Sequence, residues 1–191
     1  MTDPAPVAAA ESDLVAAIDG DTAAFANLYR DLQPRLRRYA WSLVGQDADD
    51  VTGEAWLQIA RDLRAFSGDL DSFRGWTARI VRNRALDHLR ATARRPAAAT
   101  DVAHRLDQPT PDAEMTALEA LSTAAALELI RRLPREQAEA VLLRAVVGLD
   151  SATAGEVLGK SATAVRVAAH RGLKALAKQL VTDGTHPRVA P

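Results

Sequence analysis

The sequence predicts an all-α protein with two small helical domains joined by a flexible acidic linker. Hydrophobic residues make up 48% of the chain but aromatic residues only 4%, and this alanine-rich composition favours packed helices over strands. Helical periodicity is lost between Pro96 and Met115, where three prolines and an excess of acids indicate a linker. The predicted domains are residues 13–95 and 116–182, the linker is 96–115, and 183–191 form a tail.

Composition also excludes several classes of protein. The chain has no cysteine, which rules out disulfides, thiolate metal sites and cysteine nucleophiles. Its first residues have neither the basic region nor the apolar core of a secretory signal. No uncharged apolar run approaches the roughly 18 residues that a membrane span requires. A cytoplasmic protein without membrane insertion is therefore expected.

No pattern indicates catalysis, a metal or a cofactor. The four histidines are scattered at positions 88, 104, 170 and 186, without the spacing of metal ligands or of a nucleophile and its base. The segment "GEVLGKS" from Gly155 is one residue too short for a phosphate-binding loop, and no strand precedes it. The chain is not expected to be an enzyme.

In the first domain, helical patterns follow one another from Asp13 to Arg95. Asp21 is the expected N-cap of the second helix and Gly45 its stop. The last stretch, residues 73–95, carries seven arginines and a single acid, although the formal net charge of the chain is −1. Such a stretch favours phosphate contacts. Periodicity places its arginines on several faces, so it defines no single DNA-facing surface.

Aromatic side chains lie among these arginines. Phe73 and Trp76 are able to stack on unpaired bases. Packing in the protein core is the alternative interpretation of Trp76, and taken alone that residue favours it.

The second domain has the spacing of a helix-turn-helix. Pro134 lies near the start of a helix and Gly148 just past its end. A short helix follows, opened by Asp150 or Ser151 and closed by Gly159, and then a longer helix with Ser161 as its N-cap. Two helices around a tight glycine-containing turn are typical of this motif.

The longer helix has an apolar face and a basic face. The expected apolar stripe is Val165, Ala169, Leu173, Leu176 and Leu180. The opposite side carries Arg166, Val167, His170, Arg171, Lys174 and Lys178. A helix in the DNA major groove needs this division, although an ordinary amphipathic surface helix also shows it.

Three segments together resemble a known family. They are "DADDVTGEAWLQIARDL", "SFRGWTARIVRNRALDHLR" and "IRRLPREQAEAVLLRAVVGLD", the last leading into the helix-turn-helix. From about Asp13 to Leu180 the chain resembles an extracytoplasmic-function (ECF, group IV) sigma factor of the sigma-70 family. The resemblance implies a protein that binds core RNA polymerase, directs it to specific promoters and helps to melt the −10 element. It also implies an anti-sigma factor as a partner.

The resemblance implies three sets of site residues. Those facing core polymerase would be Asp49, Asp50, Glu54, Trp56, Leu57 and Ile59. Those at the −10 element would be Ser67, Asp69, Asp71, Trp76, Arg79, Arg82, Asn83, Asp87 and Arg90. Those at the −35 element would be Ser161, Arg166, Val167, His170, Arg171 and Lys174.

The sequence departs from the family pattern at several positions, and two alternative functions are open. Gly53 stands where a glutamine is usual, and Val167, Ala168 and Ala169 replace more polar residues, which leaves the −35 preference open. An ordinary helix-turn-helix regulator would explain only the C-terminal half. A module that binds polymerase without recognising promoters is the other alternative, and promoter binding in the presence of polymerase would exclude it.

Overall fold

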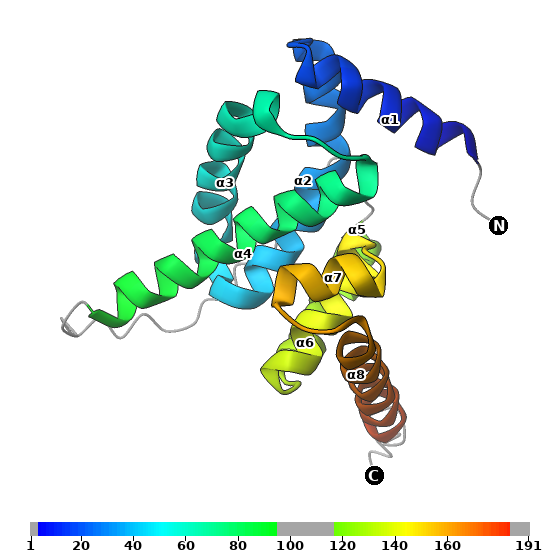
Figure 1. Cartoon of the computed structure of the whole chain (residues 1–191). Helices are drawn as coiled ribbons and strands as arrows, with labels where there is room; N and C mark the ends of the chain where they lie inside the picture. Colours follow the sequence, from blue (N-terminus) through cyan, green and yellow to red (C-terminus); the bar gives the residue numbers. More distant parts are fainter. Residues whose placement is uncertain (1–3, 95–116, 184–191) are drawn as a thin grey trace.

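A computed structural model describes residues 4–94 and 117–183, and these residues are almost entirely helical (Figure 1). The predicted all-α class is confirmed. The predicted linker at 96–115 and tail residues 184–191 lie outside the described residues. The α-helices are α1 (Pro4–Ile18), α2 (Thr22–Val44), α3 (Ala48–Asp62), α4 (Leu70–Arg94), α5 (Ala117–Arg131), α6 (Arg135–Val141), α7 (Ser151–Leu158) and α8 (Ala162–Asp183). A π-helical segment, Leu142–Val147, extends α6.

Capping residues set the helix ends, as the sequence predicts. The Asp21 carboxylate accepts hydrogen bonds from the backbone amides of Ala23 and Ala24 at 2.7 and 3.1 Å, and α2 ends at Gly45 with φ 65°. Asp150, not Ser151, caps α7 by accepting from the Thr153 amide at 2.7 Å. Gly159 ends α7 in the left-handed conformation, where glycine carries no Cβ penalty.

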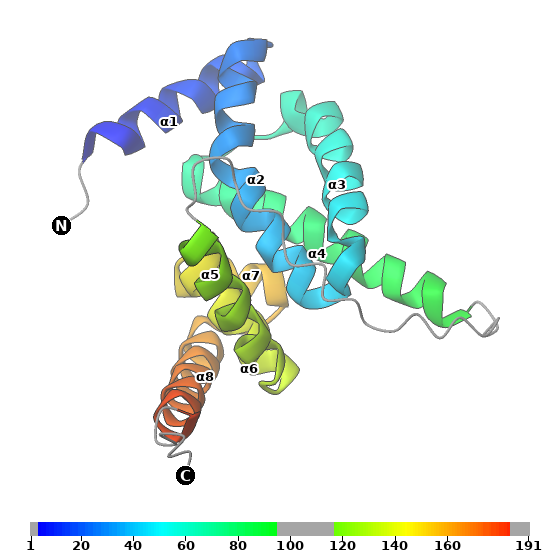
Figure 2. The ribbon, with the colours of Figure 1, turned by 180° about the vertical axis from the view of Figure 1, so that it is seen from behind.

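The first helical unit comprises α1 to α4, in which α2, α3 and α4 pack against one another (Figure 2). Tyr39, Ile59 and Phe73 are fully buried at its centre. Helix α1 begins at Pro4, well before Asp13, where the helical pattern of the sequence becomes clear. Three rings from Phe66, Phe73 and Trp76 stack at centroid distances of 5.1 to 5.9 Å at the start of α4. These rings fix α4 against the turn before it.

In the second unit, α5 to α8, the apolar stripe of α8 differs from the predicted one. Val165 and Ala169 are buried, but Leu173 is 52% exposed, and the next buried position is Gly172. At 100° per residue, Gly172 (i+7) lies about 20° around the helix axis from Val165 (i), whereas Leu173 (i+8) lies about 80° from it. A Cβ on Gly172 would lie 2.7 Å from Val141 Cγ2, so its glycine allows α8 to cross α6 closely.

The two units pack against each other and share one buried hydrophobic cluster. Helix α7 lies on α4, while α5 and the π-helical segment lie on α2 (Figures 1 and 2). The Arg131 guanidinium stacks over the Trp41 ring at 4.8 Å, which joins α5 to α2 by a cation–π contact. The described residues therefore form a closed arrangement of both units.

Replacing Gly53 by alanine is expected to raise the free energy of unfolding by about 0.5–1 kcal/mol, because glycine weakens a helix interior. Gly53 is exposed within α3, its φ is not positive, and nothing lies within 4 Å of an added Cβ. Urea denaturation followed by circular dichroism measures the change. Gly45→Ala is the matched control: its site is equally open but has φ 65°, so this variant is expected to destabilise. Equal effects of the two variants would contradict the prediction.

Candidate nucleic-acid and polymerase interfaces

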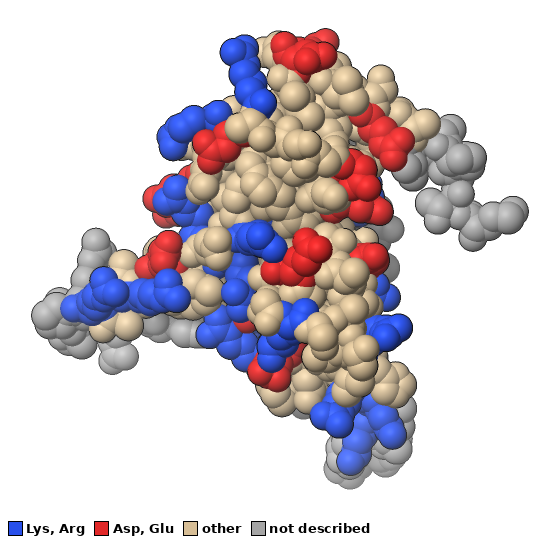
Figure 3. Space-filling view, in the orientation of Figure 1, with Lys and Arg blue, Asp and Glu red and all other residues tan. Residues whose placement is uncertain are grey.

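Helix α4 presents one exposed polar stripe, whereas Arg74, Arg82 and Arg84 lie on other faces, in line with the expectation that the arginines share no single face. Arg79, Asn83, Asp87 and Arg90 are all exposed and fall at i, i+4, i+8 and i+11, within about 80° of one another. Asp87 accepts a hydrogen bond from Arg90 at 2.9 Å. The outer end of α4 is visibly basic in the space-filling view (Figure 3).

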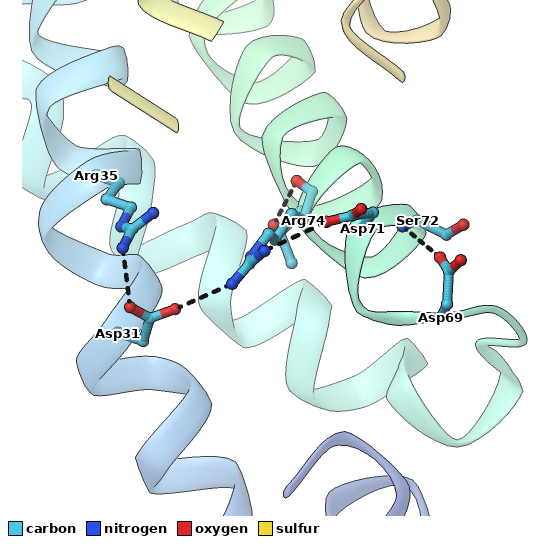
Figure 4. Close-up of polar contacts among 7 residues, drawn as sticks. Asp31, Arg35, Asp69, Asp71, Ser72 and Arg74 are labelled. Carbon is cyan, nitrogen blue, oxygen red and sulfur yellow. Dashed lines mark hydrogen bonds and ion pairs between the residues drawn. The ribbon is translucent and has the colours of Figure 1, made fainter. Parts of the chain in front are cut away.

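Other arginines of α4 hold the first unit together. Arg84 donates to the Gln58 side-chain oxygen on α3 at 2.9 and 3.2 Å. Arg74 lies between Asp71, at 3.2 Å, and Asp31 on α2, at 3.9 Å (Figure 4). The concentration of arginine in this stretch therefore serves packing as well as a charged surface.

The predicted −10 residues Ser67 and Asp69 lie in the loop before α4 and Asp71 lies in the first turn of α4, and all three are exposed. Asp69 Oδ1 accepts the backbone amide of Ser72 at 2.8 Å (Figure 4). Hydrogen bonds from Ser72 hold the pKa of the Asp69 carboxyl below its ordinary value. Asp69 is thus fixed as an ionised hydrogen-bond acceptor at the tip of the loop.

Three predicted DNA-binding residues of α4 make contacts within the protein. Trp76 is partly buried against Phe66 and Phe73, in line with its alternative interpretation as a core residue. Arg82 Nε donates to Glu139 Oε2 of α6 at 2.7 Å. Arg79 Nη2 donates to the Glu156 carbonyl oxygen at 2.9 Å. Both arginines therefore contact the second unit in this structure.

On α3 the structure corrects two of the predicted polymerase-facing residues. Trp56 and Ile59 are buried, and Trp56 Nε1 donates to Gln33 Oε1 at 2.6 Å. They lie on the side of α3 that packs on α2 and α4, so neither side chain faces a partner. Asp50 and Glu54 are exposed on the outer face, and Leu57 is 68% exposed there.

Asp49 has an internal partner. Its two carboxylate oxygens accept from Arg37 Nε and Nη2 at 2.6 and 2.9 Å, and this hydrogen bonding lowers the pKa of the Asp49 carboxyl. The carboxylate is nevertheless 63% exposed. It is therefore a fixed surface charge at the start of α3.

The predicted −35 residues are all exposed on α8 or just before it, and basic side chains gather at that end of the molecule (Figure 3). Ser161 Oγ accepts from the Ala164 amide at 3.2 Å, as an N-cap does. Arg166 Nη2 donates to Thr163 Oγ1 at 3.1 Å, a neighbour that the sequence analysis did not identify. The exposed residues of α8 include Thr163, Arg166, Val167, His170, Arg171 and Lys174.

Two further findings concern sites of other kinds. Within residues 4–94 and 117–183, no group of three or more His, Cys, Asp or Glu side chains is placed to hold a metal ion. None of the helices in the described part of the chain is both long and apolar enough to cross a membrane.

Comparison with known proteins decides the family. Residues 28–95 match Sigma-70 region 2 and residues 123–176 match Sigma-70 region 4. The ECF RNA polymerase sigma factor BldN of Streptomyces coelicolor is 32% identical over 166 residues, covering 86% of this chain and 63% of that protein. The chain belongs to the ECF sigma factors. SigD of Mycobacterium tuberculosis is 30% identical over 176 residues, covering 89% of this chain and 83% of SigD.

Two solved structures have a similar fold. The structure of CnrH in complex with the cytosolic domain of CnrY matches with a TM-score of 0.61 at 25% identity, covering 92% of this chain and 99% of that one. RpoE of Bartonella quintana, in complex with the anti-sigma factor NepR, also gives 0.61, covering 83% and 98%. The RpoE match has 19% identity and supports the fold alone.

Proposed function

We propose that this ECF sigma factor binds core RNA polymerase in the cytoplasm, directs it to specific promoters and helps to melt the −10 element. One observation carries the proposal: the region 2 unit presents the polar stripe of α4, and the region 4 unit of the same chain presents the basic face of α8. The functional units are residues 13–95 and 116–182, and the acidic linker would follow the polymerase cleft between them.

At the −10 element the protein would capture bases without covalent chemistry. Unpairing costs a few kcal/mol per base, and binding the extruded base offsets it. The ionised Asp69 and the exposed Asp71 are acceptors suited to the amino group of an exposed base edge. Along α4, Arg79, Asn83 and Arg90 are positioned for phosphates and bases of the melted strand.

At the −35 element α8 would enter the major groove. Its exposed arginines and His170 lie on the face opposite the buried Val165 and Ala169. Arginine side chains at this position in a helix-turn-helix read guanine edges or phosphates. Val167, 42% exposed, is suited to an apolar contact such as a thymine methyl group.

Polymerase would dock on the outer face of α3. Asp50 and Glu54 supply negative charge there, and Leu57 supplies an exposed apolar side chain. A basic and partly apolar helix is the complementary partner. Trp56 and Ile59 support this face from beneath, because both are buried in the core of the region 2 unit.

An anti-sigma factor is a further proposed partner. The RpoE structure that shares this fold is a complex with an anti-sigma factor. A helix-turn-helix regulator without a sigma role is not favoured, because residues 28–95 match region 2.

Replacing Arg90 by alanine is expected to weaken open-complex formation about 10-fold, since it removes one DNA contact. The affinity of this variant for core polymerase should stay within about twofold of the wild-type value, because Arg90 lies on α4, away from the proposed docking face. Permanganate footprinting measures melting, and fluorescence titration measures polymerase binding. Arg132→Ala, an exposed arginine beyond α5, is the matched control. Equal loss of melting and of polymerase affinity would refute this division of roles.

A further inference from the structure

The region 4 unit packs on the first half of α4 and engages Arg79, the first member of the stripe. Helix α7 packs on α4, and a Cβ on Gly75 would overlap the Thr153 side chain of α7. Arg79 donates to the carbonyl oxygen of Glu156, also on α7, at 2.9 Å. The outer half of the stripe, from Asn83 to Arg90, remains exposed. One unit of the protein therefore masks part of the other unit's proposed DNA surface.

A buried carboxylate holds this arrangement. Glu139 on α6 is 3% exposed. Its Oε2 accepts from Arg82 Nε of α4 at 2.7 Å, and its Oε1 accepts from Arg135 Nε at 2.8 Å. Arg82 belongs to the region 2 unit, whereas Arg135 belongs to the same helix as Glu139. The carboxylate therefore joins the two units through one charge-assisted bond that is largely shielded from water.

The surroundings of this bond favour the ion pair. The buried Tyr39 ring of α2 lies beside Arg82 and Glu139, so the bond lies over the core of the region 2 unit. Burial by itself lowers the pKa of the Arg82 guanidinium, but its hydrogen bond and charge interaction with Glu139 outweigh burial and leave that pKa raised. Breaking the contact would remove one of the two guanidinium hydrogen bonds of the Glu139 carboxylate.

We propose that Glu139 takes the place of a DNA phosphate on Arg82 and latches the factor in a closed state that masks the first half of α4 from promoter DNA. Carboxylate and phosphate oxygens are equivalent acceptors for a guanidinium, so the Arg82 Nε donor cannot serve both at once. The proposal rests on the proposed function, which makes α4 a DNA-binding helix. The latch must open before the first half of α4 receives a strand.

In the closed state the proposed polymerase-docking face and the proposed −35 face both stay accessible. The outer face of α3, with Glu54 and Leu57, and the exposed face of α8 lie outside the contact between the units. Residues 95–116 connect the units, and a chain of that length spans at most about 80 Å when extended. The covalent connection therefore permits separation while polymerase or a −35 element is bound.

The test compares Glu139→Gln with Glu136→Gln. Glu136 lies on the same helix, but its ion pair with Lys160 stays within the region 4 unit. The cysteine-free chain accepts spin labels at Ala60→Cys on α3 and Ala177→Cys on α8, both exposed. Double electron–electron resonance then measures the distance between the two spin labels, which reports the separation of the units. Glu139→Gln is expected to increase the long-distance population about 10-fold or more, while wild type and Glu136→Gln give one short distance.

A second variant and two further readouts separate the possible failures. Gly75→Gln has no room beside Thr153 and favours the α4 helix, so it should also open the protein. Both open variants should bind a labelled 20-nucleotide mixed-sequence single strand about 10-fold more tightly. Unchanged distances in both variants would overturn the latch, and separation without tighter binding would overturn the masking. Absence of transcripts with core polymerase from every variant would instead refute the proposed function.

Discussion

Replacing Phe73 by alanine is expected to lower the free energy of unfolding by about 3–5 kcal/mol, the range for truncating a buried phenylalanine. Phe73 is fully buried in the first turn of α4 and stacks on Phe66 and Trp76 at 5.5 and 5.9 Å. Losing the ring opens a cavity at the junction of α4 with the loop before it. Urea denaturation followed by circular dichroism measures the change.

Leu89→Ala is the matched control for Phe73→Ala. Leu89 lies on the same helix but is 38% exposed, so its truncation removes much less buried surface and should cost no more than about 1 kcal/mol. A change below about 1 kcal/mol for Phe73→Ala would show that the ring cluster does not fix the start of α4.

Replacing Leu57 by aspartate is expected to weaken binding to core polymerase about 30-fold or more. Leu57 is 68% exposed at the centre of the outer face of α3, and a charge there would be buried without a partner in the docked complex. The fold should be unaffected, because the side chain packs against little of the protein itself. Competition against a labelled sigma factor for purified core polymerase measures the affinity.

Val15→Asp is the matched control for Leu57→Asp. Val15 is 63% exposed on α1, away from the proposed docking face, so this variant should bind polymerase as the wild type does. Equal affinities of the two variants, both folded, would place the polymerase contact elsewhere on the molecule.

Local patterns predicted the helices and the helix-turn-helix well. Caps such as Asp21 and Ser161 act within three residues of their own position, so they are readable along the chain. The same applies to Gly148 and Gly159, whose left-handed conformations end their segments. The choice between Asp150 and Ser151 depended on which side chain reached the Thr153 amide, which only the structure shows.

The apolar stripe of α8 shows the limit of pattern reading. Counting apolar side chains selects Leu173, but the stripe continues through Gly172, which has no side chain to mark it. The determinant is the close crossing with Val141 on α6. A helix-crossing position of this kind is defined by its partner helix and not by its own sequence.

On α3 the family resemblance assigned six residues to a polymerase-facing surface, but two of them are buried. Trp56 and Ile59 lie on the buried face, and Glu54 and Leu57 on the exposed one. The helical phase separates these two sets only once it is known which side meets α2 and α4. The buried donor–acceptor pair of Trp56 and Gln33 comes from two different helices.

The contact between the two units had no signal in the sequence. Arg82 and Glu139 are 57 residues apart, and neither lies in a pattern that differs from an ordinary charged helix face. The structure turns Arg82 from a residue assigned only to DNA into one that also joins region 2 to region 4. Long-range pairs of this kind depend on tertiary packing, which local periodicity does not encode.

Transcription with purified core RNA polymerase tests the central claim most directly. The protein is added to polymerase and a pool of genomic promoter fragments, and the start sites of the transcripts are sequenced. We expect transcripts that appear only when the protein is present and that share upstream elements near −35 and −10. Sequence-specific duplex binding by the protein alone, with no transcript from any fragment, would contradict the sigma-factor account and favour an ordinary regulator.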